Sequence, residues 1–344
     1  GRYVSTWHGI VTKDPDTGLV NWGMYRQMVH NEKLMGGLLF PMSDAGKHRR
    51  KYEARGEEMP FATFIGGDPL CCIAATTTGL PDEAEAAGGL RGEPVELVKC
   101  KTVPLEVPAY SEIVIEGYVC REEIKILEGP FGEYTGYRTS PRELRSVYRV
   151  TCITWRNDPI YAMTNMGIPV EEGQLTYATL GMSAAFRKEL ERHGIPITGV
   201  YVPPEGVGHI VIVGTRVPYN HIATQIGNLI TSTTMGQIVV NIVIVVDDTV
   251  DPYNLTEVIH AIATKLHPQR GIISYPAWTS PLNPYMSLQE RLYGHGAKAI
   301  FDCIWPVEWD PELEKPIKSS FRTIYSEEIQ KKVLENWEKY GYRA

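Results

Sequence analysis

The pattern of apolar residues changes once along the chain, near residues 167–173, and this change limits the possible folds. Before it, short segments rich in β-branched and aromatic residues are separated by Gly, Pro and Asp, which predicts β-strands. After it, candidate helices and strands alternate, which predicts a sheet with helices on its faces. The sequence therefore predicts a mixed α+β chain, with a β-barrel or compact sheet at residues 1–166 and an α/β layered domain at residues 167–324.

The expected elements follow from this pattern. In the first region we expect a helix near Asp44–Arg55 and strands at Tyr3–Val11, Gly36–Pro41, Phe61–Ile65, Leu70–Ala75, Glu96–Thr102, Glu112–Val119, Leu144–Trp155 and Ile160–Met166. In the second we expect helices at Thr176–His193, Tyr219–Thr231 and Leu255–Lys265, and strands at Ile197–Val202, His209–Gly214 and Ile238–Val246. Residues 325–344 should contain a C-terminal helix from Ser326 to Tyr340, because Ser is a good N-cap. Its apolar stripe packs on its own domain or, alternatively, on a neighbouring subunit.

Composition excludes several classes of protein. The 344 residues suffice for two domains, and a net charge of −7 gives no electrostatic basis for binding nucleic acid. The longest apolar run, Ile238–Val246, is interrupted by Asn241 and is too short for a membrane span. The six cysteines show no CxxC pair, so we expect a reducing cytoplasm, with Cys71 and Cys72 buried in a strand.

Residues 128–137 carry the strongest chemical signal: Glu-Gly-Pro-Phe-Gly-Glu-Tyr-Thr-Gly-Tyr. Glycine and proline fix a tight backbone, so Glu128 and Glu133 can face one cavity. Paired acids in a partly apolar pocket suit proton transfer, because one can stay ionised while the other stays protonated. A surface hairpin with two solvated glutamates is the alternative, but so many glycines and aromatics favour the cavity.

This stretch resembles the signature of the UbiD family of reversible decarboxylases, which use prenylated flavin mononucleotide (prenylated FMN). Residues 87–117, the Asn-Trp-Gly-Met-Tyr-Arg segment at 21–26 and the Ile-Gly-Gly-Asp-Pro segment at 65–69 are also similar to the family. The resemblance implies a split β-barrel of flavin-reductase type in the first region. Family members carry a further N-terminal region, which we expect to be absent or on another chain.

The resemblance assigns roles to three residues. Arg26 is implied to lie between Glu128 and Glu133, although an isolated Arg at a strand end is usually exposed. The guanidinium stays charged and presents a planar fork that can hold a carboxylate. Glu133 is implied to protonate the substrate carbon once carbon dioxide has left, while Glu128 anchors Arg26.

Cleavage of a carboxylate from an aromatic or alkenyl carbon needs an electron sink, which protein side chains do not provide. The resemblance supplies prenylated FMN, its phosphate held by Mn²⁺ (or Mg²⁺) and K⁺. The implied metal ligands are Asn21, His48 and Glu83. The other implied cofactor contacts are Trp22, Met24, Tyr25, Arg26 and Asn241, with Ala75, Thr76 and Thr77 around the potassium ion.

Two positions depart from the family pattern. The family's histidine follows its asparagine by a shorter interval than His48 follows Asn21, and Asp44 occupies the unshifted place. We prefer His48 and keep Asp44 as the alternative; composition alone does not separate Glu83 from Glu85. Asn241 stands where the family has a lysine near the flavin, so one positive charge is missing.

The predicted function is reversible decarboxylation or carboxylation of an aromatic acid, with hydroxylated acids favoured. Candidate pocket walls are Met163–Pro169, Ser232–Gly236 and Pro276–Met286. The implied partners are the aromatic acid and carbon dioxide, a flavin prenyltransferase that supplies the cofactor, and further subunits of a homo-oligomer or larger complex. The alternatives are a catalytically silent subunit and an ordinary flavin reductase.

Overall fold

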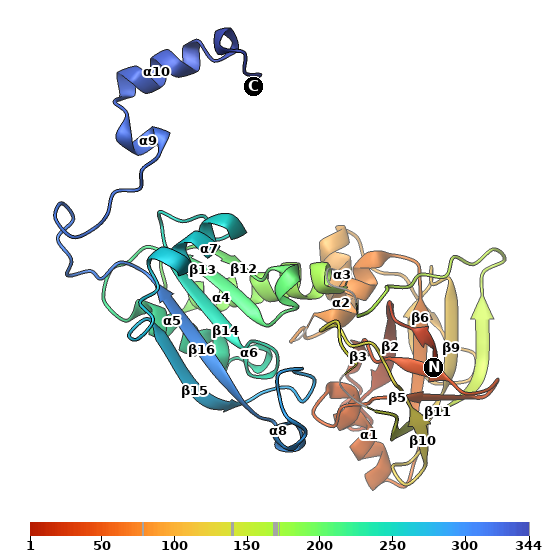
Figure 1. The fold of residues 1–344 in the computed structure, drawn as a ribbon. Helices are drawn as coiled ribbons and strands as arrows, with labels where there is room; N and C mark the ends of the chain where they lie inside the picture. The colour runs from red at the N-terminus through yellow and green to blue at the C-terminus, as the bar shows by residue number, and fades with distance from the viewer. Residues whose placement is uncertain (78, 139–140, 168–170, 172, 344) are drawn as a thin grey trace.

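The computed structural model describes residues 1–344 except 78, 139–140, 168–170, 172 and 344. Figure 1 shows a β-rich unit beside an α/β unit, with a C-terminal segment that projects away from both. The predicted mixed fold, with a curled antiparallel sheet followed by an α/β layer, is therefore confirmed.

The first unit is built on one antiparallel sheet. Its nine strands are β1 (Arg2–Ser5), β2 (His8–Lys13), β3 (Val20–Gly23), β4 (Gln27–Val29), β5 (Leu34–Gly37), β6 (Met59–Ile65), β9 (Ile113–Val119), β10 (Lys125–Glu128) and β11 (Glu143–Trp155). They follow the order β1-β4-β5-β11-β9-β6-β2-β3, with β10 paired to β11. The strand predicted at Tyr3–Val11 is thus two strands, β1 and β2, in different parts of the sheet.

The connection between β3 and β4 shows why this sheet must curl. Strand β3 ends the strand order and β4 is the second strand from the other end, yet only residues 24–26 join them. So short a connection spans at most about 14 Å. Gln27 secures the closure, because its Oε1 accepts hydrogen bonds from Ser5 Oγ (2.7 Å) on β1 and Thr63 Oγ1 (3.0 Å) on β6. Arg26 consequently lies where the two ends of the sheet meet.

Three helices and a small hairpin cover this sheet: α1 (Asp44–Ala54), α2 (Pro69–Thr76), α3 (Glu83–Arg91), β7 (Leu97–Lys99) and β8 (Glu106–Pro108). The predicted strand at Leu70–Ala75 is wrong, because these residues form α2. Asp68 caps that helix by accepting a hydrogen bond from Leu70 N (2.9 Å), and Pro69 occupies its first turn. The predicted strand at Ile160–Met166 is also wrong, since those residues are irregular.

The second unit has a five-stranded sheet in the order β12-β13-β14-β16-β15. Its strands are β12 (Ile197–Tyr201), β13 (Ile210–Thr215), β14 (Ile242–Asp247), β15 (Ile272–Trp278) and β16 (His295–Cys303). Its helices are η1 (Gln174–Met182, a π-helix), α4 (Ser183–Arg192), η2 (Pro204–Gly206), α5 (Ile222–Ser232), α6 (Thr234–Ile238), α7 (Leu255–Thr264) and α8 (Leu288–Tyr293). The predicted strand at Ile238–Val246 starts four residues late, because α6, capped by Thr233, extends to Ile238.

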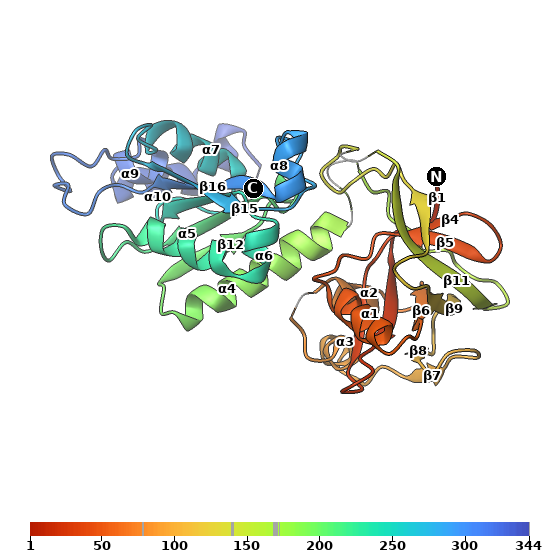
Figure 2. The same ribbon diagram turned by 90° about the horizontal axis from the view of Figure 1, so that it is seen from below.

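Alternate residues of the central strands face opposite layers. Val211 and Val213 pack with α4 and α5, whereas Ile212 and Ile244 pack on the other face with α7. Figure 2 shows α4 reaching from this unit toward the first one. Among the described residues no helix or strand lies between Trp155 and Gln174, so the domain bounds 1–166 and 167–324 remain predictions.

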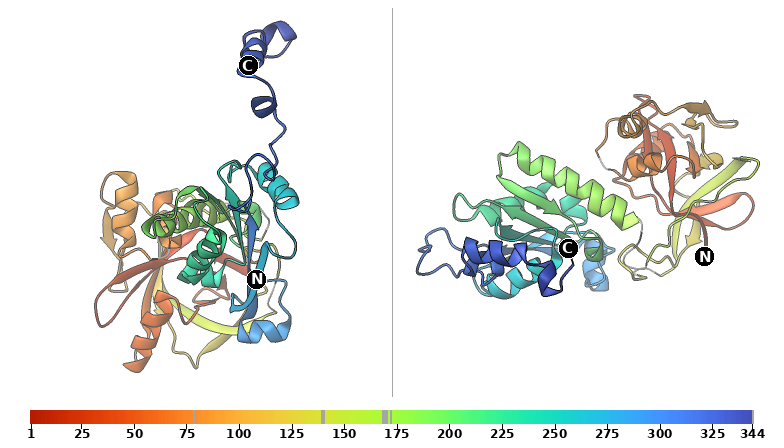
Figure 3. Two further views of the ribbon diagram at one scale, coloured as in Figure 1. Left: turned by 90° about the vertical axis from the view of Figure 1, so that its left-hand side faces the viewer. Right: turned by 90° about the horizontal axis from the view of Figure 1, so that it is seen from above.

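The C-terminal segment contains α9 (Phe321–Ile324), α10 (Glu327–Glu335) and the short 3₁₀ turn η3 (Glu338–Tyr340). The single helix predicted to Tyr340 is therefore interrupted at Asn336. Figures 1 and 3 show the segment standing clear of both units. Ile329 and Leu334 of its apolar stripe are exposed. A search of the described residues for a helix long and apolar enough to cross a bilayer found none.

Candidate active site

Arg26, between β3 and β4, contacts both glutamates of the 128–137 segment. Arg26 donates from Nε to Glu128 Oε1 (2.9 Å), from Nη2 to Glu128 Oε2 (3.1 Å) and from Nη1 to Glu133 Oε1 (2.5 Å). The guanidinium thus holds Glu128 with two hydrogen bonds and Glu133 with one. We call these three residues the acid–base trio.

Burial sets the electrostatics of the trio. Glu128 is 1% exposed and Glu133 is 4% exposed. Burial raises the pKa of Glu133, although the charge and hydrogen bond of Arg26 oppose this. Burial works against the charge of Arg26, but both carboxylates outweigh it and raise the pKa of the guanidinium. Two carboxylates therefore share one fixed positive charge, which favours one proton on the pair, and the raised pKa points to Glu133 as its holder.

The backbone of the 128–137 segment explains how both acids reach Arg26. Glu128 ends β10, and Gly129 then adopts φ +99°, which L side chains rarely tolerate. Phe131 follows, and the Arg26 guanidinium lies 4.6 Å from the centroid of its ring. The turn thus places an aromatic face and the second acid, Glu133, on one cation.

The predicted metal ligands lie in one buried neighbourhood. Thr12 Oγ1 lies 3.0 Å from His48 Nδ1, and Asn21 Nδ2 donates to the same hydroxyl at 3.5 Å. Glu83 Oε2 accepts a hydrogen bond from Trp22 N (2.9 Å), the residue after Asn21. Strands β2 and β3 and helices α1 and α3 therefore bring together all three implied ligands. We call Asn21, His48 and Glu83 the ligand cluster.

The alternatives that the sequence left open differ in burial. His48 is buried, whereas the Asp44 side chain is 58% exposed and pairs with Lys47. Glu83 is buried, whereas Glu85 is exposed. The geometry therefore places His48 and Glu83 beside Asn21.

The ligand cluster fits a divalent cation. Burial raises the pKa of Glu83, and no ion pair to this carboxylate exists among the described residues. Burial also lowers the pKa of His48, which favours the neutral imidazole that metals bind. One carboxylate, one imidazole and one amide oxygen form a mixed set suited to Mn²⁺ or Mg²⁺.

The predicted potassium shell lies at the C-terminal end of α2. Thr76 Oγ1 and Thr77 Oγ1 both donate to Ile73 O, at 2.8 and 2.9 Å, and Ala75 is buried. The carbonyl end of a helix attracts cations. This placement agrees with a monovalent cation site, which stays a prediction.

The remaining residues of the 21–26 segment have different surroundings. The Trp22 side chain is buried in the core and packs edge-on against Phe64, with ring centroids 5.1 Å apart. Met24 packs beside the same core. Tyr25 hydrogen-bonds to Asn21 and to Ser43, the N-cap of α1. Trp22 and Met24 thus support the segment, and Tyr25 ties the ligand cluster to α1.

Asn241 lies in the second unit, and its side-chain amide is engaged there. Its Nδ2 donates to Asn283 Oδ1 (2.8 Å), and its Oδ1 accepts from Thr279 Oγ1 (3.1 Å). Lys298 precedes Ala299, whose N donates to Asn241 O (2.8 Å), so the two positions are neighbours across β14 and β16. Lys298 is 2% exposed and donates to Gly236 O and Gln237 O. A buried positive charge therefore stands beside Asn241, on the adjacent strand.

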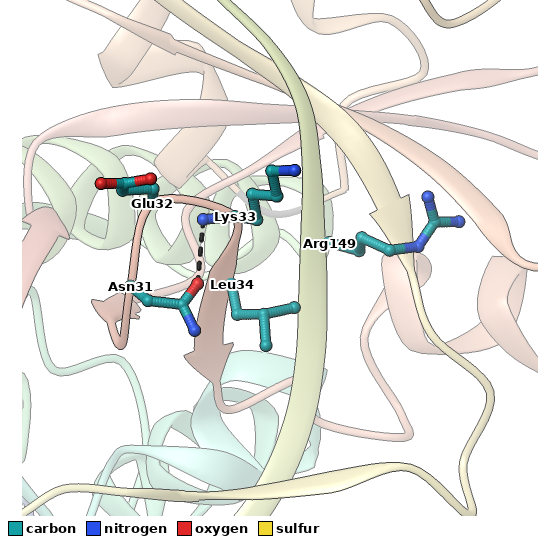
Figure 4. Close-up of a pocket in the computed structure, with 5 residues that line it drawn as sticks. All are labelled: Asn31, Glu32, Lys33, Leu34 and Arg149. Carbon is teal, nitrogen blue, oxygen red and sulfur yellow. Dashed lines mark hydrogen bonds between the residues drawn. The ribbon is translucent and has the colours of Figure 1, made fainter.

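Two of the three predicted pocket walls meet in the second unit. Ser280 N donates to Ile238 O (3.0 Å), which joins the Pro276–Met286 segment to the end of α6 near Ser232–Gly236. Of Met163–Pro169, residues 168 and 169 lie outside the described residues. Figure 4 shows a different surface hollow, lined by Asn31, Glu32, Lys33, Leu34 and Arg149, which contains none of the predicted site residues.

The sequence interpretation missed three further residues at or near the site. Tyr3 donates to Glu128, Thr12 links His48 to Asn21, and the ring of Tyr134 packs against His209 of the second unit. Tyr134 could have been noticed, because it follows Glu133 directly. Tyr3 and Thr12 depend on how distant strands pair, which no local pattern indicates.

Comparison with known proteins agrees with this geometry. The family model of the UbiD 3-octaprenyl-4-hydroxybenzoate carboxy-lyase Rift-related domain matches residues 1–169, and that of its C-terminal domain matches residues 176–303. The fold and these two matches thus define a carboxy-lyase. The chain belongs to the UbiD family.

Relatives and solved structures specify the class further. Ferulic acid decarboxylase 1 of Saccharomyces cerevisiae is 30% identical over 100% of this chain and 70% of its own length. Pyrrole-2-carboxylic acid decarboxylase of Pseudomonas aeruginosa is 28% identical over 99% of this chain and 70% of its own length. The vanillic acid decarboxylase of Sedimentibacter hydroxybenzoicus superimposes with a TM-score of 0.84 in its closed form, at 31% identity, over 97% of this chain and 70% of that chain. Its open form gives a TM-score of 0.79, at 30% identity, over 98% of this chain and 70% of that chain.

A further solved structure contains the modified flavin. An evolved dimeric form of the UbiD-class enzyme HmfF from Pelotomaculum thermopropionicum, in complex with prenylated FMN, has a TM-score of 0.77 at 26% identity. The match covers 92% of this chain and 68% of that one. The enzymes named in these comparisons are decarboxylases or UbiD-class enzymes, and this chain is a carboxy-lyase of the same class.

Proposed function

We propose that this chain catalyses reversible, non-oxidative decarboxylation of an aromatic carboxylic acid, preferably hydroxylated, with prenylated FMN. The observation that carries the proposal is the acid–base trio, in which one partly buried arginine joins two buried carboxylates. Relatives named for ferulic, vanillic and pyrrole-2-carboxylic acids support a planar aromatic or heteroaromatic substrate.

Arg26 has donors to spare for a substrate. A guanidinium carries five N–H donors, and the trio uses three of them. The remaining donors can hold the substrate carboxylate beside Glu133. Glu133 then delivers its proton to the substrate carbon from which carbon dioxide has left. In the reverse direction the ionised Glu133 removes that proton, so one site serves both directions.

Glu128 keeps the arrangement in place. Its two hydrogen bonds with Arg26 fix the plane of the guanidinium, and two parallel bonds give directional specificity. Because Arg26 also contacts Glu133, Glu128 indirectly sets the position of the proton donor.

The ligand cluster would hold the phosphate of the cofactor through Mn²⁺ or Mg²⁺, with K⁺ near Ala75 and Thr76. When bound, prenylated FMN supplies the electron sink that the side chains lack. A flavin prenyltransferase is the expected source of the cofactor. The buried cation Lys298 and its neighbour Asn241 would face this chemistry from the second unit.

The C-terminal segment supports a homo-oligomer or a larger complex. Ile329, Leu334 and Trp337 form an apolar stripe on a segment that extends away from both units. Burying such a stripe removes apolar area from water. We propose that another subunit covers it.

The test starts from co-expression with a flavin prenyltransferase and purification without oxygen. The protein is then incubated with aromatic and cinnamic-type acids in deuterated water. Deuterium on the carbon that lost its carboxylate supports the proposal and identifies the substrate class. Bound cofactor without exchange on any acid of the panel contradicts it.

The same preparation separates the alternatives. A silent subunit binds neither cofactor nor substrate, and a flavin reductase oxidises a reduced nicotinamide. The complete trio favours the active enzyme, because a subunit without activity has no need for two buried carboxylates around one arginine.

A further inference from the structure

The two carboxylates of the trio differ in how many donors they receive. Glu128 accepts two hydrogen bonds from Arg26 and a third, at 2.5 Å, from the hydroxyl of Tyr3. Among the described residues, Glu133 accepts one side-chain hydrogen bond, from Arg26. Hydrogen bonds to the ionised form of an acid favour that form. The extra donor therefore biases the shared proton toward Glu133.

The fold holds Tyr3 firmly in this position. Tyr3 lies on β1 and pairs with Met28 of β4, two residues after Arg26. Its ring packs edge-on against Phe131, with centroids 4.6 Å apart, and the Arg26 guanidinium contacts that same ring. Burial and then the hydrogen bond with Glu128 raise the pKa of Tyr3, so its hydroxyl remains a donor at neutral pH.

The other ionisable groups around the pair do not replace this donor. His30 lies near Glu128, but burial lowers the pKa of its imidazole, and Arg142 lowers it further. Arg145 acts on Glu133 only through its charge. Among the described residues, Tyr3 is thus the one donor to the Glu128 carboxylate besides Arg26.

We propose that Tyr3 is a positioning residue whose hydroxyl keeps Glu128 ionised and thereby assigns the catalytic proton to Glu133. The inference rests on the proposed function, in which Glu133 is the proton donor. It adds a residue outside the 128–137 segment that decides which of two similar acids carries the proton.

Tyr3→Phe tests the proposal, because the variant keeps the ring against Phe131 and removes only the hydroxyl. Without that donor Glu128 competes for the proton, so the fraction of protonated Glu133 falls. A hydrogen bond to a charged group is strong enough for a roughly tenfold lower kcat plateau. The same competition raises the total proton affinity of the pair, so the alkaline limb of the kcat profile moves up by about one pH unit. KM should change less than about threefold, because Arg26 still holds the substrate.

Tyr161→Phe is the matched control. The Tyr161 hydroxyl donates to Val4 O (2.6 Å), so this variant removes a tyrosine hydroxyl from the neighbouring residue of β1 without touching the trio. It should keep the plateau and the alkaline limb of the wild type. Equal losses in both variants, or a lower plateau in Tyr3→Phe without a shifted limb, would show that Tyr3 only anchors the strand and would overturn the proposal.

A second readout does not need activity. Isotope-edited infrared spectroscopy of cofactor-free protein labelled with ¹³C-glutamate detects protonated carboxyl groups. Glu133→Gln should remove the signal of the site in the wild-type background, but should leave most of it in the Tyr3→Phe background, where the proton lies on Glu128. A signal that stays on Glu133 without the hydroxyl overturns the proposal, even if no substrate is found. Absence of turnover in the wild type counts only against the proposed function.

Discussion

The acid–base trio and the ligand cluster share the segment 21–26, but they are completed in different ways. In the trio, Arg26 supplies the positive charge that Glu128 and Glu133 need, so the protein alone satisfies the site. In the ligand cluster, the buried Glu83 has no cationic partner among the described residues, and Thr12 is the main link between the other two members.

This difference indicates which half of the site depends on a bound metal ion. A buried acid without a basic side chain is costly unless a cation binds it. The trio should therefore keep its geometry when metal and cofactor are removed, whereas the ligand cluster should loosen.

Arg26→Ala should give the largest loss. The variant leaves two buried carboxylates unpaired, and removal of one partner of a buried ion pair costs about 3–5 kcal/mol of stability. Activity should disappear, because substrate binding and chemistry both use the guanidinium. Chemical denaturation and turnover measure the two effects. Loss of metal alone, with unchanged stability, would place Arg26 in the ligand cluster instead.

Glu133→Gln should remove turnover while preserving the ligand cluster. The amide can still accept a hydrogen bond from Arg26 but cannot donate a proton to carbon, and loss of a general acid costs on the order of a hundredfold or more in rate. Single-turnover kinetics with metal and flavin analysis measure this. Retained turnover would assign the proton to another group.

His48→Ala should weaken Mn²⁺ binding by at least about tenfold, because the cluster loses its imidazole ligand. Asp44→Ala is the control, since Asp44 is exposed and four residues away. Calorimetric titration of the cofactor-free protein compares the two. If Asp44→Ala alone lowers the affinity, the ligand assignment is wrong.

The pH dependence of stability should show the smallest effect. Burial raises the pKa of Glu133 above its ordinary value of 4.5, so the folded protein keeps this proton to higher pH than the unfolded chain. The resulting stability is fully present below that ordinary value and is lost as pH rises through the raised pKa. As pH rises through this window, the Tm of the wild type should therefore fall relative to that of Glu133→Gln, which does not titrate at this position. A constant difference would mean that the pKa of Glu133 is not raised.

Local patterns predicted strands β12, β13 and β14 and helices α4, α5 and α7 of the second unit, because these strands are apolar runs and these helices are amphipathic, but they missed β15 and β16. They failed at Leu70–Ala75, where an apolar run was interpreted as a strand although Asp68 and Pro69 mark a helix start. They also failed at Ile160–Met166, whose β-branched and aromatic residues lie in an irregular connection. Both segments show that apolar content does not by itself separate strand, helix and loop.

The sequence alone predicted site residues that are close to one another in the chain. Residues that lie far apart could be grouped only through the family resemblance. The pattern of residues 128–137 predicted both acids, and the resemblance of residues 21–26 to the family predicted Arg26. The sequence does not show that His48 is buried and Asp44 exposed, because the orientation of α1 decides which side chain is buried. Tyr3 lies 125 residues from Glu128, and only the pairing of β1 with β4 brings them together.

Tyr134 gives the proton donor a second attachment. It follows Glu133 in the chain, yet its ring lies 5.7 Å from that of His209, and its hydroxyl lies beside Ser280, both in the second unit. A displacement of one unit relative to the other would therefore also move the residue next to the acid. The second unit thus contributes to the position of the proton donor, although all three residues of the trio belong to the first unit.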